Sequence, residues 1–204
     1  MSYSSLVRWS GLAAIVAGVG LLIAELLELL TGFGDETFSE LAQTGLFIFQ
    51  QALYLLSLTL LLVGLVGLYA RQLETAGPLG LVGFLVALLG TVLLAGFFWA
   101  NVFIAPALAH GAPEFLDLGG RFPGFFPSLL TYAVGWILFG LASLRARVYP
   151  RAAAILLILG AALDPLGGLH LPFTGVVIDV AFAWLGFSLF SRRGAPVEQP
   201  ARVV

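Results

Sequence analysis

Six long apolar segments, divided by short polar or Gly- and Pro-containing stretches, dominate the hydrophobicity pattern of this chain. A helix of about 20 apolar residues crosses the hydrocarbon core of a bilayer. Lipid offers no hydrogen-bond partner to an open strand edge, so each such segment must be helical. The pattern therefore predicts an all-α, polytopic membrane bundle of six transmembrane helices. The segments run from Trp9 to Leu30, about Thr44 to Ala70, Leu79 to about Ala107, about Phe125 to Leu144, Ala152 onward, and about Pro172 to Phe190.

The fifth segment is interrupted by Asp164-Pro165 and Gly167-Gly168. With 60% hydrophobic and 10% charged residues among 204, the chain cannot cover a water-facing surface. Short connections between the segments leave no room for a soluble catalytic domain. We therefore predict one transmembrane domain over residues 1–193. The remaining residues, 194–204, lack hydrophobic periodicity and are predicted to form a disordered cytoplasmic tail.

The basic residues predict the orientation. All nine are Arg, and eight lie at alternate ends of the apolar segments, with Arg121 as the exception. Loops rich in Lys and Arg stay in the cytoplasm, so both termini are expected inside the cell. The eight residues are Arg8, Arg71, Arg145, Arg147, Arg151, Arg192, Arg193 and Arg202.

Nine of the eleven acidic residues then fall in the outer half of the bilayer or outside it. Asp164 and Asp179 lie within apolar segments, and Glu25 lies near the outer boundary. Three amides fall at comparable heights on the second and third segments. We expect these groups to line an outward-facing polar cavity formed by Glu25, Gln50, Gln51, Asn101, Asp164 and Asp179.

An unpaired Asp near the middle of a membrane span costs about 2.5–3.5 kcal/mol on insertion scales. Such groups are protonated, face a watered cavity, or hold a cation. The leading hypothesis is a cavity that binds a cation or a small amphipathic ligand for transport or sensing, in a homo-oligomer if it transports.

A non-catalytic structural or accessory subunit, which packs against lipid or another membrane protein, is the alternative. In that case Gln50, Gln51 and Asn101 join helices by hydrogen bonds, and Asp164 with Pro165 ends a helix.

Catalytic motifs give weaker signals. A zinc-dependent intramembrane hydrolase needs about three protein ligands, which His110 and His170 could supply together with one of the membrane carboxylates. The same two histidines could ligate a single haem. The chain has no Cys and no Lys, and it contains no nucleophile elbow and no phosphate-binding loop with Lys. No cofactor is specified, and the net charge of −2 without a basic stripe argues against nucleic acid.

Three helix-end motifs resemble those of small multi-pass membrane proteins of uncharacterised bacterial families. They are Gly67-Leu-Tyr-Ala-Arg71, the following Gly-Pro-Leu-Gly80, and Tyr149-Pro-Arg-Ala-Ala153. The resemblance implies six helices and a bacterial plasma membrane. It supplies no catalytic residues.

Overall fold

The computed structural model describes residues 3–31, 37–117, 124–169 and 174–191, and these residues are all-α, without a strand. The predicted fold class is therefore confirmed at this level. Four helices are long and apolar enough to cross a membrane. They are α1 (Tyr3–Thr31), α3 (Gly45–Gln72), α4 (Gly77–Phe103) and α7 (Phe125–Ala146). The predicted tail, residues 194–204, lies outside the described residues.

The fifth and sixth apolar segments form shorter helices. α8 (Arg151–Leu163) has 13 residues and continues into the 3-10 helix η1 (Asp164–Leu169), while α9 (Val176–Ser191) has 16 residues. At about 1.5 Å per residue, α8 and α9 reach about 20 and 24 Å, less than a hydrocarbon core of about 30 Å. Pro165 lacks an N–H group, which favours the end of α8 at this point. Six complete spans therefore remain a prediction.

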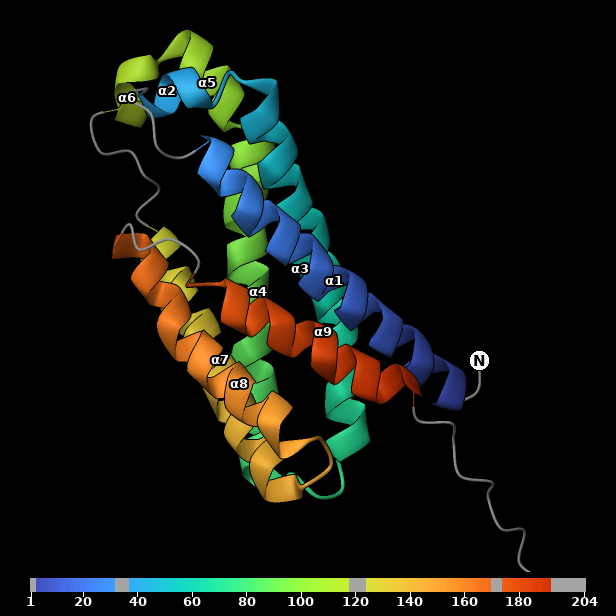
Figure 1. Cartoon of the computed structure of the whole chain (residues 1–204). Helices are drawn as coiled ribbons and strands as arrows, with labels where there is room; N and C mark the ends of the chain where they lie inside the picture. The colour runs from blue at the N-terminus through green and yellow to red at the C-terminus, as the bar shows by residue number, and fades with distance from the viewer. Residues whose placement is uncertain (1–2, 32–36, 118–123, 170–173, 192–204) are drawn as a thin grey trace, which may run out of the picture.

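Contacts among the six apolar helices follow a closed order, α1, α3, α4, α7, α8, α9 and back to α1, which we call the ring. A smaller contact joins α3 to α9. Figure 1 shows these helices from the side. Large side chains fill the interior, including Leu61, Trp136, Phe139 and Phe182, which are fully buried. The ring order brings α1, from one end of the chain, against α9, from the other.

Glycines allow several of these helices to approach closely. A β-carbon at Gly83 of α4 would lie 2.6 Å from the backbone nitrogen of Phe139 in α7, and one at Gly90 would meet the backbone of Tyr132. At the α1–α9 contact, a β-carbon at Gly18 would lie 2.5 Å from the carbonyl oxygen of Asp179. In lipid the hydrophobic effect does not drive helices together, and small residues at such crossings allow the close packing that does.

Three short helices cover one end of the bundle. They are α2 (Phe38–Leu41), α5 (Ala105–Gly111) and α6 (Pro113–Asp117), and together we call them the cap (Figure 1). The third apolar segment was expected to continue to about Ala107, but α4 ends at Phe103 and α5 begins anew, with Pro106 in its first turn. The Asp117 carboxylate links α6 to α2, because it accepts hydrogen bonds from Ser39 N (2.9 Å) and Ser39 Oγ (2.7 Å).

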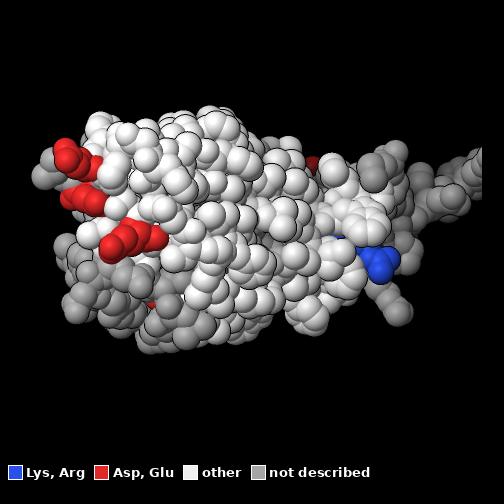
Figure 2. Space-filling view, turned by 90° about the horizontal axis from the view of Figure 1, so that it is seen from above, with Lys and Arg blue, Asp and Glu red and all other residues white. Residues whose placement is uncertain are grey.

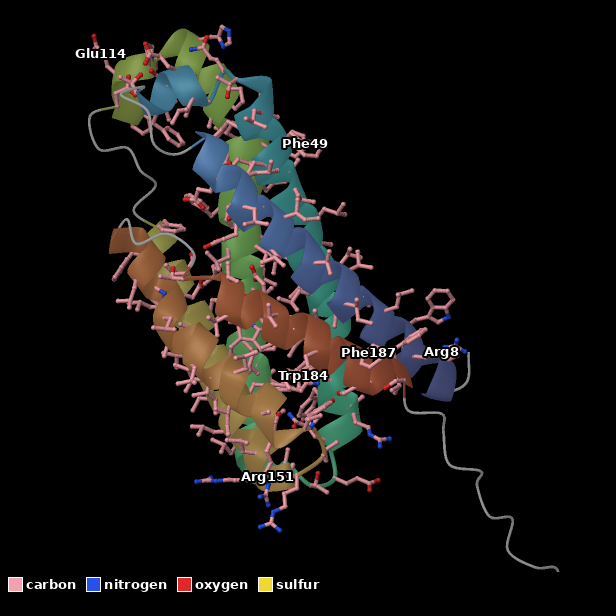
Figure 3. The ribbon with its side chains drawn as sticks, in the orientation of Figure 1. Arg8, Phe49, Glu114, Arg151, Trp184 and Phe187 are labelled. Carbon is pink, nitrogen blue, oxygen red and sulfur yellow. The ribbon has the colours of Figure 1, made fainter. Side chains whose placement is uncertain are left out.

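Charge separates the two ends of the bundle. The cap has Glu40, Glu114 and Asp117, while the opposite end has Arg71, Arg145, Arg147 and Arg151, together with Glu74, at two helix turns. We call this opposite end the arginine end. In the view of Figure 2, from the cap side, uncharged side chains cover most of the surface between acidic groups at the left and a basic group at the right. Phe49 of α3 and Trp184 and Phe187 of α9 are exposed, with exposed fractions of 60%, 42% and 58% (Figure 3). These features suit a helical bundle that contacts lipid around its middle.

Candidate functional site

Carboxyl groups from two distant parts of the chain meet beside Gly175, just before α9. A β-carbon built on Gly175 would lie 3.0 Å from Glu25 Oε2 of α1 and 3.2 Å from Asp164 Oδ1 of η1. The two carboxyl oxygens are therefore no farther apart than the sum of these distances. Glu25 Oε1 also accepts a hydrogen bond from the Gly175 N–H group at 3.2 Å. Glu25 thus binds the backbone at the start of α9, where partially positive N–H groups favour a carboxylate.

Tyr54 of α3 brings a second glutamate into the same group. Its Oη lies 3.2 Å from Glu25 Oε2 and 3.3 Å from Glu28 Oε2, in hydrogen-bonding position to both. A phenol has one hydroxyl proton, so the two carboxylates share a single donor. We call Glu25, Glu28, Asp164 and Asp179 the carboxyl cluster.

Asp179 is the most deeply buried member of the carboxyl cluster, with an exposed fraction of 5%. It lies in the first turn of α9, close enough to Glu25 and Asp164 to interact electrostatically with both. Its carboxyl group makes no hydrogen bond or ion pair with the residues that the structure describes. Among the described residues, it therefore has no partner of the kind that a purely structural role requires.

Exposure changes gradually across the carboxyl cluster. Glu28 is exposed, Glu25 and Asp164 are half-buried, and Asp179 is buried. The cluster therefore extends from the surface into the bundle. Counted at about 1.5 Å per residue, Asp164 lies about 20 Å along α8 from Arg151, and Asp179 lies about 18 Å along α9 from Ser191.

Aromatic rings adjoin the carboxyl groups. Tyr54 stacks on Phe98 of α4, with ring centroids 4.5 Å apart. Tyr132 of α7 is buried, interacts electrostatically with Asp164 and Asp179, and lies edge-on to Phe182, with centroids 6.5 Å apart. The carboxyl cluster thus combines negative charge with neighbouring aromatic rings, and negative charge and aromatic rings both interact favourably with organic cations.

The three amides predicted to line the cavity hold helices together in the structure. Gln50 Nε2 donates to the Ala24 carbonyl oxygen at 3.1 Å and joins α3 to α1. Asn101 Nδ2 donates to Gln51 Oε1 at 2.9 Å and joins α4 to α3. The Gln51–Asn101 pair lies about one helical turn from Tyr54 and Phe98, towards the cap. Asn101 Oδ1 is buried and has no hydrogen-bond partner among the described residues.

The two histidines are not brought together by what the structure describes. His110 is exposed on α5 in the cap, and its Nδ1 donates to the Pro106 carbonyl oxygen at 2.8 Å. His170 lies outside the described residues. Across the described ranges, no group of three His, Cys, Asp or Glu residues is arranged to hold a metal ion. A metal site built on the two histidines stays a prediction without structural support.

Glu25, Asp164 and Asp179 were predicted from the sequence to lie in the site, whereas Glu28, Tyr54 and Tyr132 were not. Glu28 is about one helical turn from Glu25 on α1. The two tyrosines lie in apolar segments at the height of the acidic residues. A buried Tyr hydroxyl usually has a polar partner, so the depth of these two tyrosines is the sequence feature from which their place in the site could have been predicted.

Protein-family models, curated proteins and solved structures were compared with this chain, and none matches it. Function must therefore be inferred from the geometry of the carboxyl cluster.

Proposed function

We propose that this protein is a multi-pass membrane protein that binds an organic cation with apolar substituents in the carboxyl cluster, for transport or sensing. The observation that supports this proposal most strongly is Asp179, a buried carboxyl group without a partner among the described residues, beside Glu25 and Asp164. The described basic side chains lie away from the cluster. Arg8, for example, packs over the Phe190 ring near the end of α9, 5.0 Å from its centroid.

Electrostatic repulsion within the carboxyl cluster favours a bound positive charge. Two unit negative charges about 6 Å apart repel by about 3 kcal/mol at an effective dielectric constant of about 20. The cluster contains four carboxyl groups, so in the absence of a cation protons must relieve this repulsion. A cation at the same place competes with those protons, and we expect its binding to weaken as pH falls.

The surroundings favour an organic cation over a small metal ion. Metal ions require several oxygen ligands at about 2.0–2.6 Å, whereas the described carboxyl groups form no such compact set. The rings of Tyr54 and Tyr132, beside the carboxyl groups, suit apolar and cation–π contacts with an organic cation instead.

We also propose that α8 with η1, and α9, complete a six-span topology with both termini in the cytoplasm. The arginine end would then face the cytoplasm and the cap would face outward. In this arrangement α9 begins inside the bilayer, where its first N–H groups need partners, and Glu25 supplies one of them. Irregular backbone is tolerated at such depth where it lines a watered cavity. The short α9 and the carboxyl cluster are therefore both consistent with the proposed six-span topology.

Single cysteines test this topology in a chain that has no native Cys. Thr75 lies on the turn between α3 and α4 at the arginine end, and Ala112 lies in the cap; both are exposed. An impermeant thiol reagent added to intact cells should label the Ala112→Cys variant and leave Thr75→Cys unlabelled until the cells are permeabilised. The reverse pattern would place the carboxyl cluster towards the cytoplasm and contradict the outward-facing site.

Thermal unfolding of the detergent-solubilised protein tests the binding function. Tetraphenylphosphonium should stabilise the protein increasingly with concentration, by about 2.7 kcal/mol at a hundredfold excess over its Kd. Uncharged triphenylphosphine oxide should not. The Tyr54→Phe variant should show weaker stabilisation, because the donor shared by Glu25 and Glu28 is lost.

Tyr69→Phe is the matched control. Tyr69 also lies on α3 and stacks on a phenylalanine of α4, Phe84, with centroids 4.3 Å apart, but its hydroxyl has no hydrogen bond to a described residue. This variant should respond to the cation like the parent. If no cation stabilises the parent, or if both tyrosine variants respond alike, a structural subunit becomes the better interpretation.

A further inference from the structure

A second polar site lies at the arginine end, between the turn that joins α3 to α4 and the turn that joins α7 to α8. A cavity of about 550 Å³ opens there, and its lining includes the side chains of Arg71, Glu74, Thr75 and Arg147. Neither guanidinium forms an ion pair with a described residue. Within the part of the chain that the structure describes, the cavity therefore presents two positive charges and one negative charge that are not paired with one another or with other side chains.

Arg147 occupies a position where the backbone favours glycine. Its φ of 54° makes it the one non-Gly residue with positive φ among those described. It ends α7, and its N–H donates to the Ser143 carbonyl oxygen at 3.1 Å. Glycine is usual at such a left-handed helix end because it has no β-carbon. An arginine at this position has a strained backbone, and such strain is common where the side chain has a function.

Two buried hydrogen bonds hold the turns that form this cavity. Tyr149 Oη donates to the Leu68 carbonyl oxygen at 2.7 Å, and Ser143 Oγ donates to Gln72 Oε1 at 2.8 Å. The walls are therefore fixed before a ligand arrives, which lowers the entropic cost of binding.

We propose that this cavity binds the headgroup of a phospholipid that carries both a phosphate and a primary ammonium group, as in phosphatidylethanolamine. Guanidinium groups bind phosphate oxygens with paired hydrogen bonds, so Arg71 and Arg147 suit the phosphate. Glu74 suits the ammonium group. Leu73 also lines the cavity and has an exposed fraction of 57%, which places an apolar contact where an acyl chain would begin. This proposal rests on membrane insertion and not on the cation site.

The test compares phospholipids added to detergent micelles that contain the purified full-length protein, with thermal stabilisation as the measure of affinity. Dioleoylphosphatidylethanolamine should bind more tightly than dioleoylphosphatidylglycerol or dioleoylphosphatidylcholine. Arg147→Gly should weaken the binding of every lipid about fivefold, the effect of removing one charge near the headgroups. Because glycine suits this backbone position, the variant should fold at least as well as the parent.

Two further variants make the result specific. Glu74→Gln should remove the preference for phosphatidylethanolamine over phosphatidylglycerol. Arg151→Gln is the control, since Arg151 lies at the same end of the molecule (Figure 3) but does not line the cavity. It should change none of these affinities.

Three results would overturn the proposal. Equal weakening by Arg151→Gln and Arg147→Gly would indicate general surface attraction. An unchanged preference in Glu74→Gln would remove the assigned ammonium contact. Stabilisation by water-soluble glycerophosphoethanolamine equal to that by the lipid would identify the ligand as a free phosphate compound.

Discussion

Replacement of Gly90 by Ala is expected to destabilise the folded bundle by about 3 kcal/mol, at the upper end of what overpacking usually costs. The added β-carbon would meet the Cα and N atoms of Tyr132 and lie 2.7 Å from the carbonyl carbon of Thr131. These are backbone atoms of α7, so a rotamer change cannot relieve the contact and the helices must separate. Thermal unfolding in detergent, with size-exclusion chromatography to detect aggregation, measures the loss.

Gly96→Ala is the matched control, because Gly96 lies in the same helix and a β-carbon there would meet no atom within 4 Å. This variant should be as stable as the parent or more stable by up to about 1 kcal/mol, since alanine favours a helix over glycine. Equal stability of the Gly90→Ala and Gly96→Ala variants would contradict the close α4–α7 packing on which the ring of helices depends.

Asp179→Asn is expected to abolish cation-dependent stabilisation while leaving the unliganded protein as stable as the parent, or more stable by about 1–2 kcal/mol. Asn keeps the size and hydrogen-bonding capacity of Asp without the cost of a buried charge. If Asp179 instead held a buried positive partner, the substitution would leave that partner unpaired and destabilise the protein by about 3–5 kcal/mol. Thermal unfolding of both proteins without ligand separates the two cases.

Asp117→Asn provides the contrasting control. The Asp117 carboxylate accepts two hydrogen bonds from Ser39, so removal of its charge should destabilise the protein by about 1 kcal/mol and leave cation binding unchanged. Together, the two variants distinguish an aspartate retained for structure from one retained for a ligand.

Much of the fold could be predicted because lipid restricts what an apolar segment can do. The lengths of the first four segments predicted helices, and α1, α3, α4 and α7 confirm them as candidate spans. The fifth and sixth segments were less predictable. Asp164-Pro165 signalled an interruption, but apolar composition alone did not show that α9 would be as short as 16 residues.

The depth of the carboxyl groups along their helices was predictable from the sequence, but the direction in which their side chains face was not. Counting residues along each segment placed Glu25, Asp164 and Asp179 at similar depths. Which way each side chain faces depends on the ring order of the helices and on glycine contacts such as Gly18 with Asp179, which periodicity does not reveal. Gln51 and Asn101 lie at comparable depth yet bind one another, since their helices are neighbours in the ring. Tyr54 and Tyr132 were overlooked because aromatic residues in an apolar segment suggest packing first.

Equilibrium binding of radiolabelled tetraphenylphosphonium to the purified protein tests the central claim most directly. The account predicts saturable binding to the parent, weaker binding as the pH is lowered, because protons compete with the cation for the carboxyl groups, and loss of saturable binding in Asp179→Asn. The Tyr69→Phe and Asp117→Asn variants should bind like the parent. Saturable binding that is the same in the parent and in Asp179→Asn, and that does not change with pH, would show that the carboxyl cluster is not the cation site.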